Sequence, residues 1–435
     1  MRWTDSQNSV ICKPPGHTVV YATPGSGKTA VLTEHIRHVL NEGSIAPNQV
    51  LALTFTRQAA REMKLRLRQA KLPSVKNVES LRVGTFHGQI FQWLLSQRTN
   101  KVPQLLTPLE QQRWVAKAMI ATGDTKLRDL KQMMSFLSRY NSRFPAPSLP
   151  PSLQSVVDHY NNKKYKENRW DFDDILLDGY RLLTAHAETG LQSFSVEYIL
   201  VDEFQDTNEI QWKILTRLMV MTQAQIFVVG DDDQSIYAFR GSSPRWLLEA
   251  GSSLPGAKQF NLTENFRSDQ CIVHHAAALI HHNRKHVPKN WNVHSEHPGI
   301  CQVFYPINEF TQAQSIAQSL SLDRPLFGTA AVLARTRRQL VVAYQLMSAT
   351  QRNQAEFRTF HEAKGREWDI IYILGDVQIG QTQDILGQSD GEEERRLFYV
   401  AMTRAKRKLC IYAPSVMAGK RIEPSPFLTE ARLIP

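Results

Sequence analysis

The feature that most constrains the fold is a glycine-containing stretch near the start of the chain, residues 22–29 with the sequence ATPGSGKT. An apolar run at 18–21 precedes it and a helix-like segment at 30–36 follows it. A strand, a glycine turn and a helix start, in this order, let backbone N–H groups surround a phosphate. Lys28 would reach the terminal phosphates and Thr29 would hold Mg²⁺. The stretch therefore predicts a nucleoside triphosphate site, although Ala22 stands where such loops usually begin with glycine.

Two adjacent carboxylates, Asp202 and Glu203, follow a second apolar run at 198–201. Successive residues of a strand point to opposite faces, so the pattern predicts that the two side chains diverge and take different roles. We expect Asp202 to bind the magnesium shell and Glu203 to polarise an attacking water. A surface Asp-Glu pair that merely ends a strand is the alternative, and the phosphate loop upstream disfavours it.

The charge and the cysteine content narrow the class of protein. The chain has 435 residues, enough for two to four domains, and its formal net charge of +11 favours a polyanionic partner, although charge alone leaves an ordinary basic protein equally open. No apolar signal core or membrane-length run is visible, so we expect a cytoplasmic protein that binds no membrane. The cysteines show no paired spacing, which predicts neither a zinc site nor a disulfide framework and fits a reducing compartment. They are Cys12, Cys271, Cys301 and Cys410.

The order of strand-like and helix-like segments predicts an α/β fold. Apolar runs that lead into helix-like segments indicate a parallel sheet in residues 1–88 and 191–260, with ligand sites where the strands end. Residues 89–190 look helical, so we interpret them as a helical insertion in this domain. Residues 261–435 hold further apolar runs but no second phosphate loop, which predicts a second α/β domain that supplies arginines across a cleft. These runs lie at 300–305, 330–334, 370–374 and 409–413.

Several polar and aromatic residues allow two interpretations each. Gln7 could read an adenine edge, or it could be an ordinary exposed glutamine. Phe55 could stack on a base or pack in the core. Tyr237, Phe239 and Arg240 form a group suited to stacking unpaired bases, with buried packing as the alternative. The interleaved lysines and tyrosines at 160–166 could face a nucleic-acid backbone or form a solvated helix face.

Three motifs closely resemble the UvrD/Rep family of superfamily 1 helicases: VDEFQDTN at 201–208, GDDDQSIYAFRG at 230–241 and RRLFYVAMTRAK at 395–406. The likeness runs from Gln7 to about Ile411 in the family's order. It implies two RecA-like lobes with ATP between them, and 3′→5′ movement along DNA driven by ATP hydrolysis with Mg²⁺. The implied partners are single-stranded DNA and 3′-tailed duplex DNA. RNA stays open as a track, because base stacking does not read the 2′-hydroxyl.

The resemblance also implies roles for individual residues. Those implied in hydrolysis are Lys28, Glu203, Gln234, Arg267 and Arg404. Those implied in holding ATP are Gln7, Thr23, Pro24, Gly25, Ser26, Gly27, Lys28, Thr29, Phe266, Arg267, Glu367 and Arg404, with Thr29 and Asp202 as magnesium ligands. The implied DNA contacts are Phe55, Thr56, Thr85, His87, Tyr237, Phe239, Arg240, Thr359 and His361.

The chain departs from the family pattern at three places. Ala30 stands where an arginine often sandwiches the adenine, which predicts loose base selectivity. Residues 340–356 leave no room for the accessory domain usually called 2B. The hairpin expected at 375–383 lacks the aromatic that often splits the duplex, so we expect robust ATP hydrolysis and weak unwinding. Two other functions are kept open: a translocase that strips proteins from DNA without unwinding, and a non-catalytic DNA-binding subunit of a larger complex.

Overall fold

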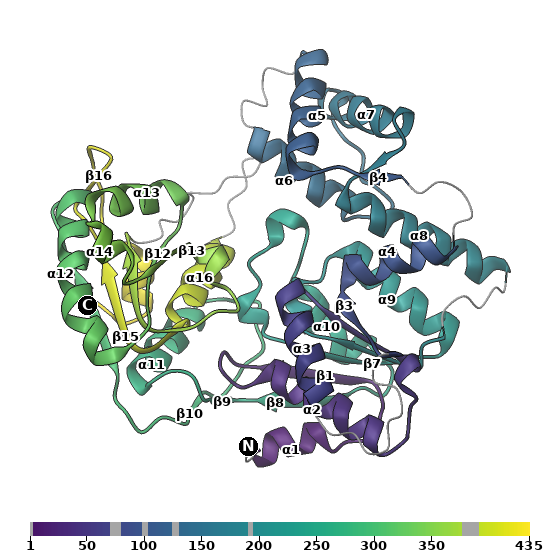
Figure 1. Ribbon diagram of the computed structural model, residues 1–435, viewed down its shortest axis with the longest axis horizontal. Coiled ribbons are helices and arrows are strands. Elements are labelled where there is room, and N and C mark those ends of the chain that lie inside the picture. Colours follow the sequence, from purple (N-terminus) through teal and green to yellow (C-terminus); the bar gives the residue numbers. More distant parts are fainter. Residues whose placement is uncertain (1–2, 70–79, 98–102, 124–129, 190–194, 376–390) are drawn as a thin grey trace.

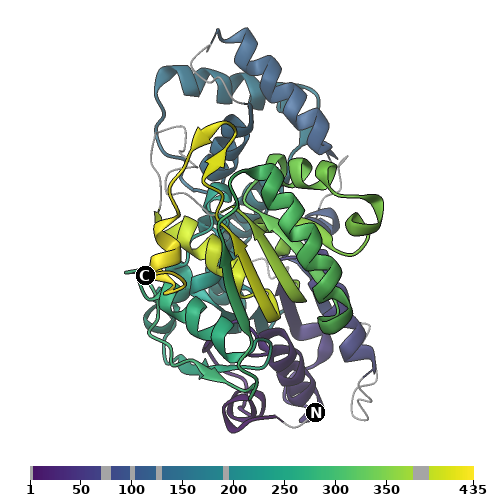
Figure 2. The same cartoon turned by 90° about the vertical axis from the view of Figure 1, so that its left-hand side faces the viewer.

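Two parallel β-sheets and a separate group of helices organise the chain (Figure 1). The computed structural model describes residues 3–69, 80–97, 103–123, 130–189, 195–375 and 391–435. We call the part built on the first sheet the first lobe and the part built on the second sheet the second lobe. In Figure 1 the second lobe lies to the left and the first to the lower right, with helices α5 to α7 above them. Figure 2 turns the second lobe toward the viewer. The predicted α/β class is confirmed.

The first sheet has six strands, each parallel to its neighbours. Their order is β3 (Arg82–Thr85), β2 (Val50–Thr54), β6 (Tyr198–Val201), β7 (Gln225–Gly230), β1 (Thr18–Ala22) and β8 (Lys258–Leu262). The connecting helices are α2 (Lys28–Asn41), α3 (Arg57–Gln69), α9 (Glu209–Thr222) and α10 (Arg245–Ser253). Strand residues alternate between two hydrophobic cores, so that Val19 packs into one and Val20 into the other. Burial on both faces explains why these strands read as continuous apolar runs.

The second sheet has five strands, and the predicted apolar runs account for four of them. Their order is β11 (Ile300–Phe304), β15 (Ala405–Tyr412), β14 (Trp368–Leu374), β12 (Ala330–Ala334) and β13 (Glu356–Thr359). Strand β13 was missed because it lies at the edge, where its residues EFRT are mostly half-buried or exposed. Its helices are α11 (Gln270–Ile280), α12 (Glu309–Phe327), α13 (Arg337–Leu346), α14 (Ala349–Arg352), α15 (Phe360–Ala363), α16 (Gly391–Met402) and α17 (Pro426–Glu430). The short pairs β9 (Glu264–Asn265) with β10 (Asn292–Val293) and β16 (Val416–Met417) with β17 (Lys420–Arg421) complete this half.

The helices between β3 and β6 form two groups. Helices α4 (Phe86–Gln97) and α8 (Phe172–Thr189) pack into the core of the first sheet. Helices α5 (Pro108–Ala121), α6 (Leu130–Asn141) and α7 (Pro151–Lys166) enclose a small core of their own. A two-stranded sheet, β4 (Gln104–Leu105) with β5 (Arg169–Trp170), closes their base. Across the described part of the chain, no helix combines the length and apolar character that a membrane crossing requires.

Both interpretations of residues 160–166 are wrong for Tyr160 and Lys164, which are 1% and 5% exposed. These two residues are four positions apart, so they share the inner face of α7. Lys164 Nζ lies 2.8 Å from carboxylate oxygens of both Asp171 and Asp174. The Tyr160 hydroxyl donates to Asp171 Oδ2 at 2.8 Å. One face of this segment therefore builds a buried charge cluster, while Tyr165 and Lys166 are exposed on the other.

Replacing Lys164 by methionine should destabilise the fold, because Asp171 would stay buried, and Asp174 half-buried, without their cation. Removing one partner from a buried ion pair costs about 3–5 kcal/mol. The matched control is Lys163→Met, which breaks a partly exposed pair with Glu167 worth at most about 1 kcal/mol. Urea denaturation followed by circular dichroism measures both changes. Equal urea midpoints of unfolding for the two variants would show that Lys164 is exposed to solvent and not buried.

Candidate functional site

The turn between β1 and α2 has the backbone that a phosphate loop requires. Gly25 and Gly27 have φ of 73° and 80°, left-handed values that glycine adopts at little cost. Ser26 Oγ donates to the Thr23 carbonyl at 2.8 Å and braces the turn. Lys28 is the first residue of α2, so the unpaired N–H groups of that helix lie at the loop. The N–H groups of Thr23 and Ser26 donate to carbonyls, so the donors for an anion would come from Gly25, Gly27 and Lys28.

Thr29 and Asp202 come together although they lie 173 residues apart. Thr29 Oγ1 donates to Asp202 Oδ2 at 2.7 Å. A hydroxyl and a carboxylate are hard oxygen donors of the kind that Mg²⁺ prefers, so the pair fits the expected metal ligands. Burial raises the pKa of Asp202, and the neighbouring Glu203 raises it further.

Glu203 is directed by a turn and not by strand alternation, because β6 ends at Val201. Its φ of 53° is left-handed, which is uncommon for a residue other than glycine. Gln205, which the sequence interpretation passed over, donates its amide to Glu203 Oε2. Burial opposes ionisation of Glu203, but Lys28 and Lys364 outweigh it and lower the pKa. Glu203 is therefore held as an anion beside the phosphate loop.

Two arginines of the second lobe reach the first. Phe266 N donates to the Gly25 carbonyl at 3.0 Å, so Arg267 follows a residue that touches the phosphate loop. Arg267 Nε lies 2.8 Å from Glu367 Oε2. Arg404 is 2% exposed and donates to Gln234 Oε1 at 2.9 Å. Burial and then the charge of Arg267 lower the pKa of Arg404 to about 9. The structure thus gathers Gly25, Gln234 and both arginines at one boundary.

Lys364 also crosses this boundary, and no role was assigned to it from the sequence. Its Nζ lies 2.6 Å from Asp206 Oδ2 and donates to the Gln234 carbonyl at 2.7 Å. It also lies 5.1 Å from the centre of the Tyr237 ring. Its position in the sequence could have indicated a role, because Lys364 lies between His361, a predicted DNA contact, and Glu367, a predicted ATP contact.

Four predicted DNA contacts form one aromatic cluster, which we define as Phe55, Tyr237, Phe239 and His361. Phe55 stacks on Tyr237 with ring centres 4.9 Å apart, and Phe239 meets His361 edge-on at 5.5 Å. The guanidinium of Arg240 lies over both Tyr237 and Phe239. The four rings are half-buried and Arg240 is exposed, so the cluster lies at the edge of the boundary, with Tyr237 packed against the core of the second lobe.

The other predicted DNA contacts lie at helix starts. Hydroxyls of Thr56, Thr85 and Thr359 each accept a backbone N–H of the following helix, which makes them N-caps of α3, α4 and α15. His87 packs edge-on against Phe172. Burial, with help from Arg240, lowers the pKa of His87 to about 4.

The predicted ATP contacts outside the loop differ in exposure. Gln7 is 5% exposed, and its amide donates to the Ser26 carbonyl at 3.1 Å while accepting from Thr4 N. It is therefore not an ordinary exposed glutamine, since it ties α1 (Asp5–Ile11) to the phosphate loop. Phe266 is 42% exposed, with its ring 4.7 Å from that of His294.

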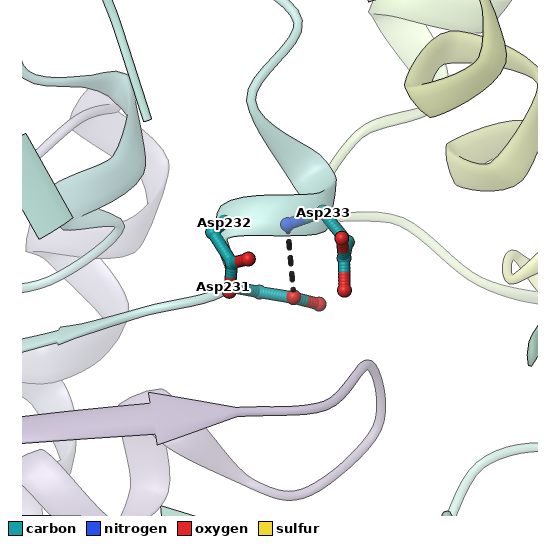
Figure 3. Close-up of side chains that lie close together, drawn as sticks. All are labelled: Asp231, Asp232 and Asp233. Atoms are coloured by element: carbon teal, nitrogen blue, oxygen red, sulfur yellow. Dashed lines mark hydrogen bonds between the residues drawn. The ribbon is translucent and has the colours of Figure 1, made fainter. Parts of the chain in front are cut away.

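Three buried aspartates, Asp231, Asp232 and Asp233, follow β7 (Figure 3). Their carboxylates lie close enough together to surround a cation, and Lys289 Nζ takes that place at 2.6, 2.6 and 2.9 Å. Asp231 Oδ2 also accepts from the Gln234 amide at 2.7 Å. Asp231 thus positions Gln234, while the ammonium group of Lys289 offsets part of the negative charge of the three aspartates.

Comparison with known proteins identifies the family. The sequence profile described as UvrD/REP helicase N-terminal domain matches residues 3–255, and that of the UvrD-like helicase C-terminal domain matches residues 342–415. The chain belongs to the UvrD/Rep helicase family.

Three relatives show the extent of the likeness. A Bacillus subtilis protein provisionally described as the ATP-dependent DNA helicase YjcD is 31% identical over 326 residues, covering 72% of this chain and 43% of that protein. The Bacillus subtilis ATP-dependent DNA helicase PcrA is 30% identical over 356 residues, covering 77% and 47%. A Mycoplasma pneumoniae protein described as a probable DNA helicase is 28% identical over 470 residues, covering 97% and 85%. The chain therefore spans less than half the length of two of these relatives and most of the third.

Of two departures from the family pattern, the structure describes the segment at 340–356 but not the expected hairpin. The hairpin expected at 375–383 lies outside the described residues, apart from Gly375. The segment at 340–356 is described throughout: α13 ends at Leu346, the short α14 follows, and β13 begins at Glu356.

Replacing Gly25 by alanine should disturb the phosphate loop. A Cβ at Gly25 would lie 2.8 Å from Arg267 Cβ and 3.2 Å from Arg267 N. Gly43 is the matched control, because its φ of 68° carries the same strain while nothing lies within 4 Å of an added Cβ. We expect Gly25→Ala to lose roughly tenfold or more in ATP affinity, a cost of about 1.4 kcal/mol. Titration with a fluorescent ATP analogue measures it, and equal affinities for the two variants would contradict the contact.

Proposed function

We propose that this protein is an ATPase stimulated by single-stranded DNA, and that hydrolysis moves it along one DNA strand. The observation that carries the proposal is the hydrogen bond from Arg404 in the second lobe to Gln234 in the first, beside the phosphate loop. Through a contact of this kind, a bound nucleotide would change the orientation of one lobe relative to the other. The relatives described as ATP-dependent DNA helicases support the same activity.

ATP would lie with its phosphates against residues 23–29, with Gln7 and Phe266 near its base and Glu367 near its ribose. Thr29 and Asp202 would hold Mg²⁺, which when bound supplies positive charge to the phosphate oxygens. Lys28, Arg267 and Arg404 would stabilise the charge that develops on the γ-phosphate. Gln234 would orient the same phosphate from the first lobe.

Glu203 would accept the proton of the attacking water. A general base must be ionised to do this, and the cations around Glu203 favour its anionic form. Gln205 fixes one of its carboxylate oxygens, which leaves the other to face the water.

The aromatic cluster would be the platform for single-stranded DNA. Aromatic rings stack on any base, so binding there would not depend on DNA sequence. Arg240 would add positive charge at the exposed edge. Lys364 connects this platform to the ATP site, because it contacts the Gln234 carbonyl and lies over the Tyr237 ring. Movement of Gln234 during hydrolysis would thereby be transmitted to the stacked bases.

Replacing Glu203 by glutamine should keep ATP binding and lose hydrolysis, because an amide cannot accept the proton. We expect a decrease of about a hundredfold or more in DNA-stimulated turnover. The control is Glu209→Gln on α9, whose carboxylate pairs with Lys213 at 3.4 Å. Phosphate release with and without single-stranded DNA measures turnover. Native turnover in the Glu203 variant would remove this residue from the mechanism, and a wild type without DNA stimulation would favour a non-catalytic subunit.

The double change Tyr237→Ala and Phe239→Ala should weaken binding to single-stranded DNA and uncouple ATP hydrolysis from it. Base stacking on an aromatic is worth roughly 1–3 kcal/mol by alanine substitution. Tyr165→Ala is the control, since Tyr165 is 89% exposed on α7, a helix that lies above both lobes in Figure 1. Fluorescence anisotropy with labelled oligonucleotides measures affinity, and circular dichroism checks the fold. Unchanged affinity in a folded double variant would locate the track elsewhere.

We further propose 3′→5′ polarity, as in the family it resembles, with weak unwinding. Opening each base-pair step costs about 1.4 kcal/mol on average, and only the short α14 stands where the accessory domain is expected. Strand release should therefore occur on 3′-tailed duplexes, not on 5′-tailed ones, and should fall steeply with GC content. Release from 5′-tailed duplexes alone would reverse the polarity. Displacement of a bound protein without any strand release would favour a translocase that does not unwind. Equal stimulation of ATP hydrolysis by RNA would show that the protein also moves along RNA.

A further inference from the structure

Two cysteines that lie 30 residues apart come into contact in the second lobe. Cys271 Sγ and Cys301 Sγ are 3.0 Å apart, and both cysteines are free. Cys271 lies in the first turn of α11 and Cys301 in strand β11. A backbone hydrogen bond from Cys271 N to the Pro298 carbonyl holds the two segments together. The pair is made by the fold, which explains why the cysteine spacing gave no sign of it.

The surroundings of the two sulfurs differ in a way that divides their chemistry. The hydrogen bond between the thiols lowers the pKa of Cys271, although burial and Asp269 oppose this. The same contact, together with burial, raises the pKa of Cys301. Cys271 also lies at the start of an 11-residue helix, where a thiolate is favoured. Both residues are half-buried, whereas Cys12 is exposed and Cys410 is buried. Cys271 is thus suited to attack a disulfide, and Cys301 is suited to attack the mixed disulfide that then forms on Cys271.

We propose that Cys271 and Cys301 form a dithiol site that low-molecular-weight disulfides oxidise to an intramolecular disulfide. The Cys271 thiolate attacks one sulfur of the small disulfide, whose S–S bond breaks and releases one thiol. Cys301 then gives up its proton and attacks Cys271 Sγ, which breaks the mixed disulfide and releases the second thiol. The protein loses two hydrogen atoms and the small disulfide gains them.

The two sulfurs already lie close to bonding distance. Bonded sulfurs lie about 2.05 Å apart, so the gap to close is roughly 1 Å. Gly299 leaves room for the pair, since a Cβ there would lie 3.1 Å from Cys271 Sγ and 2.7 Å from Asp269 Cβ. Asp269 N is anchored to the Lys406 carbonyl at 2.8 Å. In a reducing compartment the thiols would be the resting state and the disulfide a transient one.

The test uses the full chain carrying Cys12→Ser, which removes the exposed thiol, with oxidised glutathione as the probe. We expect the loss of two hydrogen atoms by intact mass, the loss of two titratable thiols, and a peptide map that links Cys271 to Cys301. Dithiothreitol should reverse all three. The oxidised protein should also unfold at a higher denaturant concentration, because the bond closes a loop of the unfolded chain. A further Cys301→Ser change should stop the reaction at a glutathione adduct on Cys271, whereas Cys410→Ser should change nothing.

Three results would overturn the proposal: a chain that stays reduced, a chain that carries only glutathione adducts, or a map that links Cys301 to Cys410. The map requires no variant of the pair itself, so a variant that fails to fold leaves the test intact. Circular dichroism before and after oxidation shows that the linked form is the folded one. A link found only in unfolded protein would also overturn it.

Discussion

Charges buried at the boundary between the lobes must be paired, and much of the site depends on this requirement. A buried charge without a partner is costly, whereas a paired and hydrogen-bonded one is tolerated. Arg404 donates to Gln234 and Lys364 pairs with Asp206, so polar groups of each lobe find their partners in the other. The same contacts position Gln234 between the phosphate loop and the aromatic cluster. Pairing therefore fixes the geometry from which the proposed function follows.

In these contacts the cations come from one side of the boundary and their acceptors come from the other. Lys289, Lys364 and Arg404 come from the part of the chain that follows β8, and the acceptors come from the loops after β6 and β7. Parallel strands place those loops at one edge of the first sheet, which concentrates carboxylates there. Asp231, Asp232 and Asp233 show the result, since their three carboxylates lie together at this edge (Figure 3), and the ammonium group of Lys289 lies within 2.9 Å of each. The acidic edge and the basic segments are complementary parts of one site.

Local patterns predicted the phosphate loop, the two sheets and most strands, because glycine at a strand-to-helix turn and continuous apolar runs are properties of neighbouring residues. What they missed depends on contacts between distant ones. The polar edge strand β13 forms because β12 offers it a partner. Lys164 is buried because Asp171 and Asp174 receive it. Lys364 and the Cys271–Cys301 pair likewise depend on residues that no spacing connects. For Glu203, the expected divergence from Asp202 comes from a left-handed turn and not from strand alternation.

Most of the apolar packing lies within one lobe or the other, although Ile236 from the loop after β7 packs into the core of the second lobe, so packing alone would leave the two much freedom to evolve as exchangeable modules. The close approach of Gly25 to Arg267 and the paired charges around it limit this freedom. A lobe borrowed from a relative would bring a different set of partners to the boundary and would leave anions or cations stranded there. Substitutions at such positions should therefore be inherited in matched sets, and the two lobes should share one evolutionary history. Swapping lobes between relatives would succeed only if the boundary residues were exchanged together.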